Sequence, residues 1–187
     1  NIATDGVGGG ILNASSPLKI EQSTIDHNIS TENGGGLTLI HDNTSITNST
    51  NISQTTISNN ISTAGAGGAI FIMASDSAFG LYILASTIED NSSYEEGGGI
   101  AAWGGFSFIN NSTITDNKTS NGTTAGIFGT PTIFFPIVTN ILVFSSIIAK
   151  NTDGVDINDT SIVMPVENNI VGSFAAGPDP VPSNIWS

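Results

Sequence analysis

The hexapeptide "STIEDN" at residues 86–91 decides the fold, because close variants of it recur along the chain. The variants read "STIDHN" (23–28), "TTISNN" (55–60), "STITDN" (112–117) and "SIIAKN" (146–151). Every copy has isoleucine at its third position and asparagine at its sixth. Successive copies lie 26 to 34 residues apart, and self-similarity at such a spacing predicts a repeat architecture.

A second phrase, built on glycine, alternates with the first. It ends in an aliphatic residue, with "GGGI" at Ile11, "GGGL" at Leu37, "GGAI" at Ile70, "GGGI" at Ile100, and weaker copies "TAGI" at Ile127 and "TDGV" at Val155. A third register places a branched aliphatic residue five positions before each isoleucine of the first phrase, at Ile20, Ile52, Ile83, Ile109 and Val143. Each unit therefore offers three short β segments separated by turn residues.

A coil is the simplest fold for such a unit, because it stacks the equivalent segments of successive units on one another. We predict an all-β fold, a right-handed single-stranded parallel β-helix (solenoid) of about six rungs, with like segments stacked about 4.8 Å apart. Residues 1–172 are expected to form the solenoid, and residues 173–187 a Pro-rich tail or an inter-subunit strand. A β-sandwich with glycine-rich turns is the alternative, but such a fold does not require three registers.

Stacking would turn the repeated residues into structural ladders. The expected members are the isoleucines Ile25, Ile57, Ile88, Ile114 and Ile148, and the asparagines Asn28, Asn60, Asn91, Asn117 and Asn151. A stacked asparagine can donate to one neighbouring turn and accept from the other, and asparagine tolerates the left-handed conformation of a tight corner. The glycine triplets are expected at another corner, where positive φ or close backbone approach excludes a Cβ.

The motifs resemble those of right-handed parallel β-helix proteins of the pectate-lyase-like superfamily. "GGAI" at 67–70 and "FINN" at 108–111 are similar to the paired GG-A-I and F-x-x-N repeats of polymorphic outer-membrane proteins and autotransporter passengers. The resemblance covers roughly residues 6–172. It implies the fold rather than one function, because the superfamily includes lyases, hydrolases, adhesins and structural fibres.

Charge and hydropathy exclude two classes of partner. The chain has 16 acidic residues, three lysines and no arginine, which gives a net charge of −13. Nucleic acids and anionic lipids are bound mainly through Lys and Arg, so we expect no nucleic-acid partner. The uncharged segment 127–149 is long enough to cross a bilayer. Because Pro131, Pro136 and many β-branched residues interrupt it, we predict buried strands and no membrane span.

Carboxylates near one corner provide the catalytic alternative. Asp90 and Asp116 have the same phase in adjacent units, beside Glu89. Carboxylates within about 5 to 10 Å of one another are the pairs that glycosidases use. The equivalent positions in the other units are not acidic, being His27, Asn59 and Lys150. We therefore interpret this row as solvated turn residues and predict that the chain is not an enzyme.

Metal and other cofactors are not expected. The run "DGVDIND" supplies Asp153, Asp156 and Asp159 as a weak Ca²⁺ candidate. Calcium requires six to eight oxygen ligands, and the run lacks the spacing of an EF-hand loop. The two histidines, His27 and His41, have different phases and are predicted to be solvated turn residues rather than ligands.

Glycosylation is the strongest surface signal. Twelve of 20 asparagines begin an Asn-x-Ser/Thr sequon: Asn13, Asn28, Asn43, Asn48, Asn51, Asn60, Asn91, Asn110, Asn111, Asn117, Asn121 and Asn158. Such sequons mark surface turns of secreted proteins, so we expect an extracellular or cell-surface glycoprotein.

These features favour a non-enzymatic structural protein. We expect a glycosylated β-solenoid rod that forms a surface fibre, sheath or adhesin stalk. Self-association by head-to-tail stacking, or contact with neighbouring surface proteins, would supply its partners. The alternative is a carbohydrate-active enzyme (a polysaccharide hydrolase or lyase) or a glycan-binding β-helix. Such a protein should display aromatic platforms, but Trp103, Tyr82, Tyr94 and Trp186 have different phases.

Overall fold

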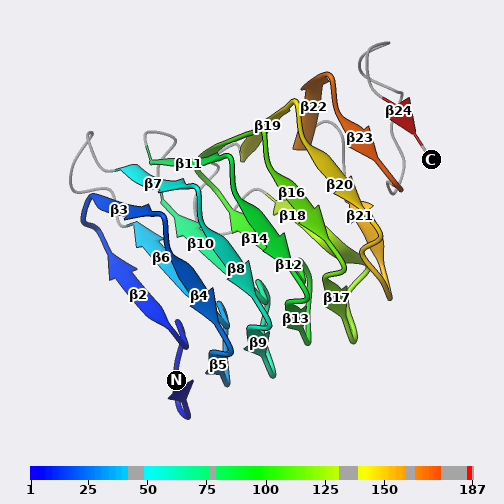
Figure 1. Ribbon diagram of the computed structural model, residues 1–187. Coiled ribbons are helices and arrows are strands. Elements are labelled where there is room, and N and C mark those ends of the chain that lie inside the picture. The colour runs from blue at the N-terminus through cyan, green and yellow to red at the C-terminus, as the bar shows by residue number, and fades with distance from the viewer. Residues whose placement is uncertain (42–48, 76–78, 131–138, 159–162, 174–184, 187) are drawn as a thin grey trace.

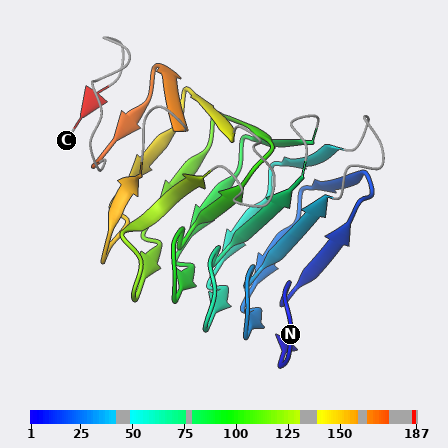
Figure 2. The same cartoon turned by 180° about the vertical axis from the view of Figure 1, so that it is seen from behind.

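The computed structural model is an all-β chain coiled into a parallel β-solenoid (Figure 1). It describes residues 1–41, 49–75, 79–130, 139–158, 163–173 and 185–186. Successive turns are stacked along one axis, and the N-terminal and C-terminal turns lie at its opposite ends (Figures 1 and 2). The predicted parallel β-helix is therefore confirmed.

Four sheets, named A to D here, run along the axis. Sheet A contains β1 (Ile2–Ala3), β5 (Ile29–Ser30), β9 (Ile61–Ser62), β13 (Ser92–Ser93) and β17 (Lys118–Thr119). Sheet B contains β2 (Ile11–Ala14), β6 (Leu37–His41), β10 (Ile70–Ala74), β14 (Ile100–Trp103), β18 (Thr124–Thr130) and β21 (Val155–Ile157).

Sheet C contains β3 (Leu18–Glu21), β7 (Ser49–Ser53), β11 (Gly80–Leu84), β15 (Phe106–Asn110), β19 (Asn140–Phe144) and β22 (Val163–Glu167). Sheet D contains β4 (Thr24–Asp26), β8 (Thr56–Ser58), β12 (Thr87–Glu89), β16 (Thr113–Thr115), β20 (Ile147–Ala149), β23 (Ile170–Val171) and β24 (Ile185–Trp186). Within the described residues, four turns (β2–β5 to β14–β17) contribute to every sheet. The predicted number of about six rungs is therefore too high for complete turns, although sheets B and C each have six described strands.

The predicted aliphatic registers form the core. Ile25, Ile57, Ile88, Ile114 and Ile148 pair in sequence across sheet D. Sheet C aligns Ile20, Ile52, Ile83, Ile109 and Val143 in the same way. From Ile52 and Ile57 onward, all these side chains are fully buried. The isoleucine ladder is therefore confirmed, and it forms one part of a continuous core that also includes Leu39, Ile72 and Leu81.

The glycine register is correct in its first five members and wrong in its sixth. Ile11, Leu37, Ile70, Ile100 and Ile127 pair across sheet B. Beyond Ile127 the partner is Ile157 rather than the expected Val155, because the register shifts between Thr124 and Ile127. The one extra residue of β18, where Ala125 and Gly126 lie opposite Asp156 alone, is accommodated by this irregularity, which no repeat motif indicates.

Each glycine triplet meets two different requirements. The first glycine has positive φ, for example 66° at Gly97. The second allows the neighbouring turn to approach, since a Cβ on Gly98 would lie 2.3 Å from the carbonyl oxygen of Lys118. The sequence prediction of a glycine corner is thereby confirmed.

The left-handed residue of the opposite corner precedes the ladder asparagine. Positive φ is found at His27, Asn59, Asp90, Asp116 and Lys150, and not at the asparagines that follow them. The expectation that the asparagines themselves adopt this conformation is therefore wrong. The preceding residue makes the sharp turn, which leaves the asparagine side chain free to point into the coil.

The apolar segment and the C-terminal tail both join the sheets. Segment 127–149 contributes to β18, β19 and β20, as predicted, while residues 131–138 lie outside the described part. In the tail, Ile185 and Trp186 pair with Ile170 and Val171 of the same chain. No helix able to cross a bilayer occurs in the described ranges.

Candidate functional site

A ladder of buried asparagines runs along the corner between sheets D and A. In each turn, the backbone N and side-chain Nδ2 of one asparagine both donate to Oδ1 of the asparagine in the next turn. These bonds measure 2.9–3.0 Å and connect Asn28, Asn60, Asn91, Asn117 and Asn151 in order. The predicted asparagine ladder is confirmed.

From Asn60 to Asn151, each ladder amide also donates to a carbonyl oxygen of the preceding turn. Nδ2 of Asn60 donates to the carbonyl oxygen of Ile25 at 2.9 Å, and Nδ2 of Asn91 donates to that of Ile57 at 2.9 Å. Each inner asparagine thus accepts two hydrogen bonds at Oδ1 and donates at least two from Nδ2, which satisfies a fully buried amide. The exposed fraction of Asn60, Asn91 and Asn117 is 0%.

The ladder extends beyond its predicted members at both ends. At one end, N and Nδ2 of Asn1 donate to Oδ1 of Asn28, each at 3.2 Å. The similarity of "NIAT" (1–4) to "NIST" (28–31 and 60–63) could have identified Asn1 from sequence. At the other end, Oδ1 of Asp156 accepts the backbone N and Nδ2 of Asn151.

Asp156, at the end of the ladder, has different surroundings from Asp153, another residue of the weak Ca²⁺ candidate. Asp156 is 2% exposed, and its Oδ2 accepts the Ser173 hydroxyl at 2.9 Å. Asp153 is exposed and has a positive φ of 64°. Asp159 lies outside the described residues. Within the described residues, no three His, Asp or Glu side chains form a group that could hold a metal ion. Asp156 acts instead as a hydrogen-bond acceptor within the fold.

A second polar ladder, not anticipated from the sequence, lies at the corner between sheets C and D. It uses the first residue of each hexapeptide: Ser23, Thr55, Ser86, Ser112 and Ser146. The backbone N of each donates to the hydroxyl of the next at 3.1–3.4 Å, and each hydroxyl donates to the carbonyl oxygen two residues earlier, as Ser86 does to Leu84. The signal for this ladder in the sequence was the serine or threonine that begins every copy of the hexapeptide.

The candidate catalytic carboxylates lie together at the outer D–A corner. Glu89 ends β12 and is half-buried, whereas Asp90 and Asp116 are exposed corner residues in adjacent turns. The Thr115 hydroxyl donates to Asp116 at 2.9 Å. The arrangement is that of the predicted turn row, in which residues with positive φ face solvent.

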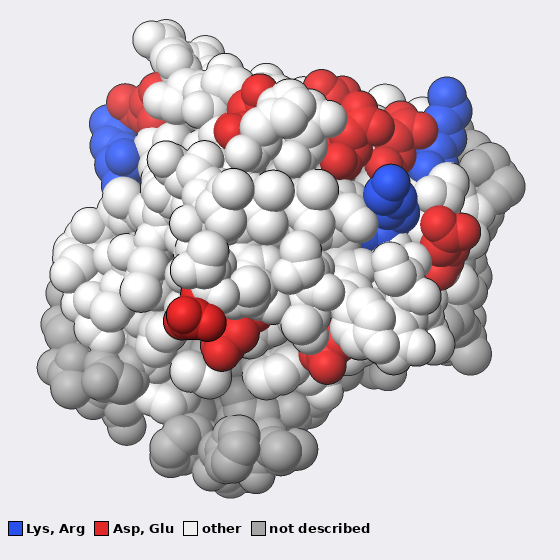
Figure 3. Space-filling view, turned by 90° about the horizontal axis from the view of Figure 1, so that it is seen from below, with Lys and Arg blue, Asp and Glu red and all other residues white. Residues whose placement is uncertain are grey.

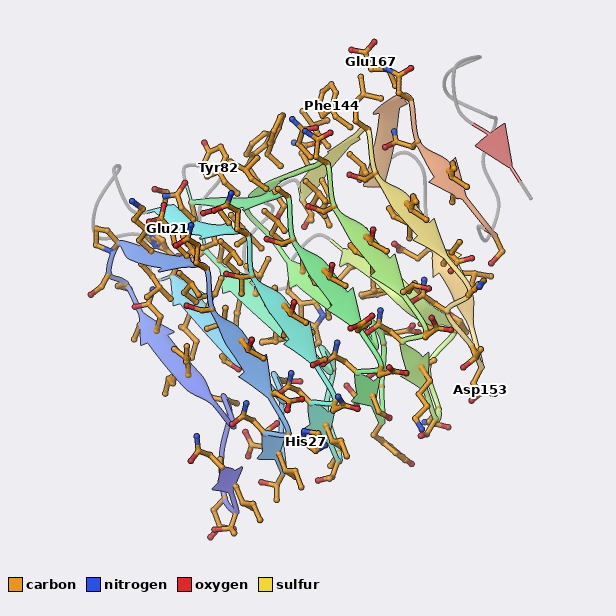
Figure 4. All side chains as sticks on the ribbon, viewed as in Figure 1. Glu21, His27, Tyr82, Phe144, Asp153 and Glu167 are labelled. Carbon is orange, nitrogen blue, oxygen red and sulfur yellow. The ribbon has the colours of Figure 1, made fainter. Side chains whose placement is uncertain are left out.

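In the same row, Asp26 has the most elaborate set of contacts. His27 Nδ1 lies 2.6 Å from one carboxylate oxygen, and the Asn59 amide and Ser58 hydroxyl donate to the other at 3.1 Å. Hydrogen bonds, first from His27 and then from Asn59, lower the pKa of Asp26 below its usual range. His27 is exposed, as expected (Figure 4).

The expectation for His41 is wrong. This histidine ends β6, is 3% exposed, and packs edge-on against Phe79 with ring centroids 5.1 Å apart. Neither ring nitrogen has a hydrogen-bond partner. In the sheet, His41 pairs with Ala74 of β10. With Ala74 and Phe79 as neighbours, the imidazole packs as an apolar ring would.

The sequons divide into buried and exposed groups. Asn28, Asn60, Asn91 and Asn117 are the buried ladder members, so the folded coil does not present their amides to solvent. Asn51, Asn111 and Asn121 are exposed, and Asn13, Asn110 and Asn158 are half-buried. Asn43 and Asn48 lie outside the described residues.

Aromatic side chains gather on the outer surface of sheet C, which was not predicted. Tyr82 and Phe108 are paired in adjacent strands, and their rings lie 6.3 Å apart between centroids. Phe144 continues the row at 5.1 Å from Phe108. Figure 4 shows Tyr82 and Phe144 projecting from the same side of the coil. Phe108 and Phe144, rather than Tyr94 or Trp103, complete this row with Tyr82.

Charge is distributed unevenly around the coil. Figure 3 shows a face on which acidic side chains gather near the upper edge and again in the lower middle, with lysines towards the sides and uncharged surface between the acidic groups. Lys19 forms an ion pair with Glu21 at 2.9 Å.

Comparisons with protein-family models, with curated proteins and with solved structures gave no match. The likeness to the pectate-lyase-like superfamily and to outer-membrane repeats accordingly stays a resemblance of motifs.

Proposed function

We propose that this chain is a structural module, a non-enzymatic β-solenoid rod of the extracellular space or cell surface. The observation that supports it best is the continuity of the asparagine ladder, which links every turn from Asn1 to Asp156. Turns joined by backbone pairing, buried isoleucines and saturated amides make a stiff, extended element. Such an element suits a surface fibre, sheath or adhesin stalk.

Glycosylation and self-association belong to the same proposal. Exposed sequons at Asn51, Asn111 and Asn121 are sites at which glycans would project from the rod. Partners of the rod would be other copies of the chain or neighbouring surface proteins.

Electron microscopy of purified native material tests the structural role. We expect unbranched rods or filaments with an axial repeat that is a multiple of about 4.8 Å per turn. Discrete particles that release reducing sugars from pectin-like polymers would contradict the proposal and favour a carbohydrate-active enzyme.

One observation favours a second candidate, a glycan-binding β-helix. The row of Tyr82, Phe108 and Phe144 presents ring faces on which sugar rings could stack. Tyr82 is 36% exposed and its neighbour Leu84 is 39% exposed. Polysaccharide affinity electrophoresis of Tyr82→Ala and Phe108→Ala tests this candidate. Tyr94→Ala is the control, because Tyr94 is exposed but follows β13 of sheet A and lies outside the row. Retardation that only the first two variants lose would support it.

A further inference from the structure

Two Asn-Gly dipeptides lie at the corner between sheets A and B, in very different surroundings. Asn33-Gly34 lies between β5 and β6, and Asn121-Gly122 lies between β17 and β18. An asparagine followed by glycine is chemically reactive, because glycine has no Cβ to keep its backbone nitrogen away from the preceding side-chain amide. The rate of the reaction in the folded protein therefore depends on how firmly the fold holds the two reacting groups.

At the first dipeptide, one residue of the next turn holds both reacting groups. Oδ1 of Asn33 accepts the backbone N of Ala66 at 2.8 Å, and the backbone N of Gly34 donates to the carbonyl oxygen of Ala66 at 3.0 Å. Gly34 is buried and has a positive φ of 69°. Reaction at Asn33 requires local opening of both hydrogen bonds between the turns, which lowers its rate in the folded protein.

The second dipeptide lacks this restraint. Asn121 is exposed, and no described residue forms a hydrogen bond with its side chain. The backbone N of Gly122 donates within the same loop, to Oγ1 of Thr119 at 3.1 Å. Glycine is nevertheless required here, since a Cβ on Gly122 would lie 2.9 Å from the carbonyl oxygen of Glu95. Close packing of this corner thus places a reactive Asn-Gly pair at the surface.

We propose that Asn121 is a site of spontaneous deamidation and that the fold protects Asn33 from the same reaction. The backbone N of Gly122 gives up its proton and forms a bond to Cγ of Asn121, while the Cγ–Nδ2 bond breaks and the side-chain nitrogen leaves as ammonia. Water then opens the cyclic imide. Cleavage of its bond to Cγ yields aspartate, and cleavage of its bond to the main-chain carbonyl carbon yields isoaspartate. This inference does not depend on the proposed structural role.

Isoaspartate at residue 121 alters the contacts of the residues that follow it. The backbone N of Thr123 donates to both carboxylate oxygens of Glu96 at 3.0 Å, and the backbone N of Thr124 donates to Oε2 of Glu96 at 2.7 Å. Isoaspartate directs the main chain through Cβ and Cγ, so it adds one carbon atom to the chain before Thr123. The longer loop moves both amides relative to Glu96, and the entry into β18 becomes less firmly held.

Ageing of the folded and the unfolded chain in parallel tests the proposal. Protein from a non-glycosylating host is used, since Asn121 also begins a sequon. Samples are incubated at mildly alkaline pH with and without urea, and peptide mapping by mass spectrometry follows Asn33 and Asn121 separately. Enzymatic methylation detects isoaspartate. In urea, where the fold restrains neither dipeptide, we expect both asparagines to convert at similar rates.

Without urea, we expect Asn33 to convert more slowly than Asn121 by about tenfold or more, because both hydrogen bonds to Ala66 must open first. Equal rates at the two sites in the folded protein would overturn the proposal. It would also be overturned if folding slowed the conversion of Asn121 as much as it slows that of Asn33.

Amide hydrogen exchange tests the effect on the Glu96 contacts. In aged folded protein, the amides of Thr123 and Thr124 should exchange about tenfold faster than in fresh protein. The matched control is Asn121→Gln, which keeps an exposed amide on a longer side chain that cyclises far more slowly. It should show neither conversion at residue 121 nor faster exchange. Unchanged exchange in fully converted protein, or equally fast exchange in the aged control, would overturn this part of the proposal.

Discussion

Nδ2 of Asn60 donates both to Oδ1 of Asn91 in the next turn and to the carbonyl oxygen of Ile25 in the preceding one, each at 2.9 Å. One side chain therefore connects three successive turns. Because the side chain of Asn60 is completely buried, water cannot replace either bond in the folded state. The repeated asparagine is consequently a stabilising element of the coil and not only a turn residue.

Substitution of a ladder asparagine should be strongly destabilising. We expect Asn91→Ala to lower the free energy of unfolding by about 3 kcal/mol or more, because each buried partner left unsatisfied costs about 1–3 kcal/mol. Asn51→Ala is the matched control, since Asn51 is exposed and, among the described residues, its side chain donates to the Ser49 hydroxyl alone. It should change stability by less than about 0.5 kcal/mol. Urea denaturation of both variants provides the comparison, and similar losses would contradict the ladder's importance.

Sequon occupancy should follow burial. In protein produced by a glycosylating host, we expect Asn60, Asn91 and Asn117 to carry no glycan, because their Nδ2 groups are buried and hydrogen-bonded. Asn111 and Asn121, which are exposed, are the expected sites. Peptide mapping by mass spectrometry measures occupancy directly, and a natively folded protein with a glycan at Asn91 is incompatible with the structure.

Glycines in one triplet should differ in their tolerance of alanine. Gly97 has φ of 66°, and a Cβ there would lie 2.3 Å from the carbonyl oxygen of Ile100. We expect Gly97→Ala to cost about 2 kcal/mol or more, since the left-handed conformation alone costs about 1–2 kcal/mol. Gly99→Ala should cost less, because the equivalent position of another turn is already alanine, Ala69. Thermal unfolding of both variants tests this order, and a larger loss for Gly99→Ala would contradict it.

Removal of one buried hydroxyl should stabilise the protein. Thr50 is 0% exposed in the core register between Leu18 and Leu81, and its Oγ1 has no hydrogen-bond partner. We expect Thr50→Val to raise the free energy of unfolding by about 1 kcal/mol, because valine preserves the volume without an unsatisfied polar group. Protein from a non-glycosylating host is needed, since Thr50 completes the Asn48 sequon. Thr56→Val, on the outer surface, should be nearly neutral.

Acid stability should depend on Asp26. The folded pKa of Asp26 is lowered by His27 and Asn59, so its ionised form favours the folded state above the unfolded pKa of about 3.9. That contribution is lost as the pH falls through the lower, folded pKa. Asp26→Asn should therefore flatten the loss of stability below about pH 4. Identical acid limbs in chemical denaturation of the two proteins would exclude this role.

The sequence predicts the parts of the fold that must repeat. The equivalents of Ile57 and Asn60 occupy the same place in each turn, so their spacing predicted the coil and, apart from the pairing of Val155, the registers of sheets B, C and D. The expected three segments per unit left out the two-residue strands of sheet A, such as Ile61–Ser62. Features that arise between registers were missed. The shift that pairs Ile127 with Ile157, and the burial of His41 against Phe79, depend on local packing that no repeated phrase encodes.

The candidate sites were harder to predict than the fold, for a related reason. The row of Tyr82, Phe108 and Phe144 combines residues from different offsets of three strands, and it is visible only once sheet C is assembled. The sequence made Asp156 part of a weak calcium candidate, because Asp153 and Asp159 are close to it in sequence. Its role is set by its neighbours in space, Asn151 and Ser173.

In-register stacking of the turns is tested most directly by engineered disulfides. The chain has no cysteine, so only the introduced pair would report. Thr56 and Thr87 are partners in adjacent strands of sheet D, where the Cα spacing of about 4.8 Å suits a disulfide. Thr56→Cys with Thr87→Cys should oxidise readily, whereas Thr24→Cys with Thr87→Cys, two turns apart at about 9.6 Å, should not. Closure of the second pair as readily as the first, or failure of the first to close, would contradict the stacked coil.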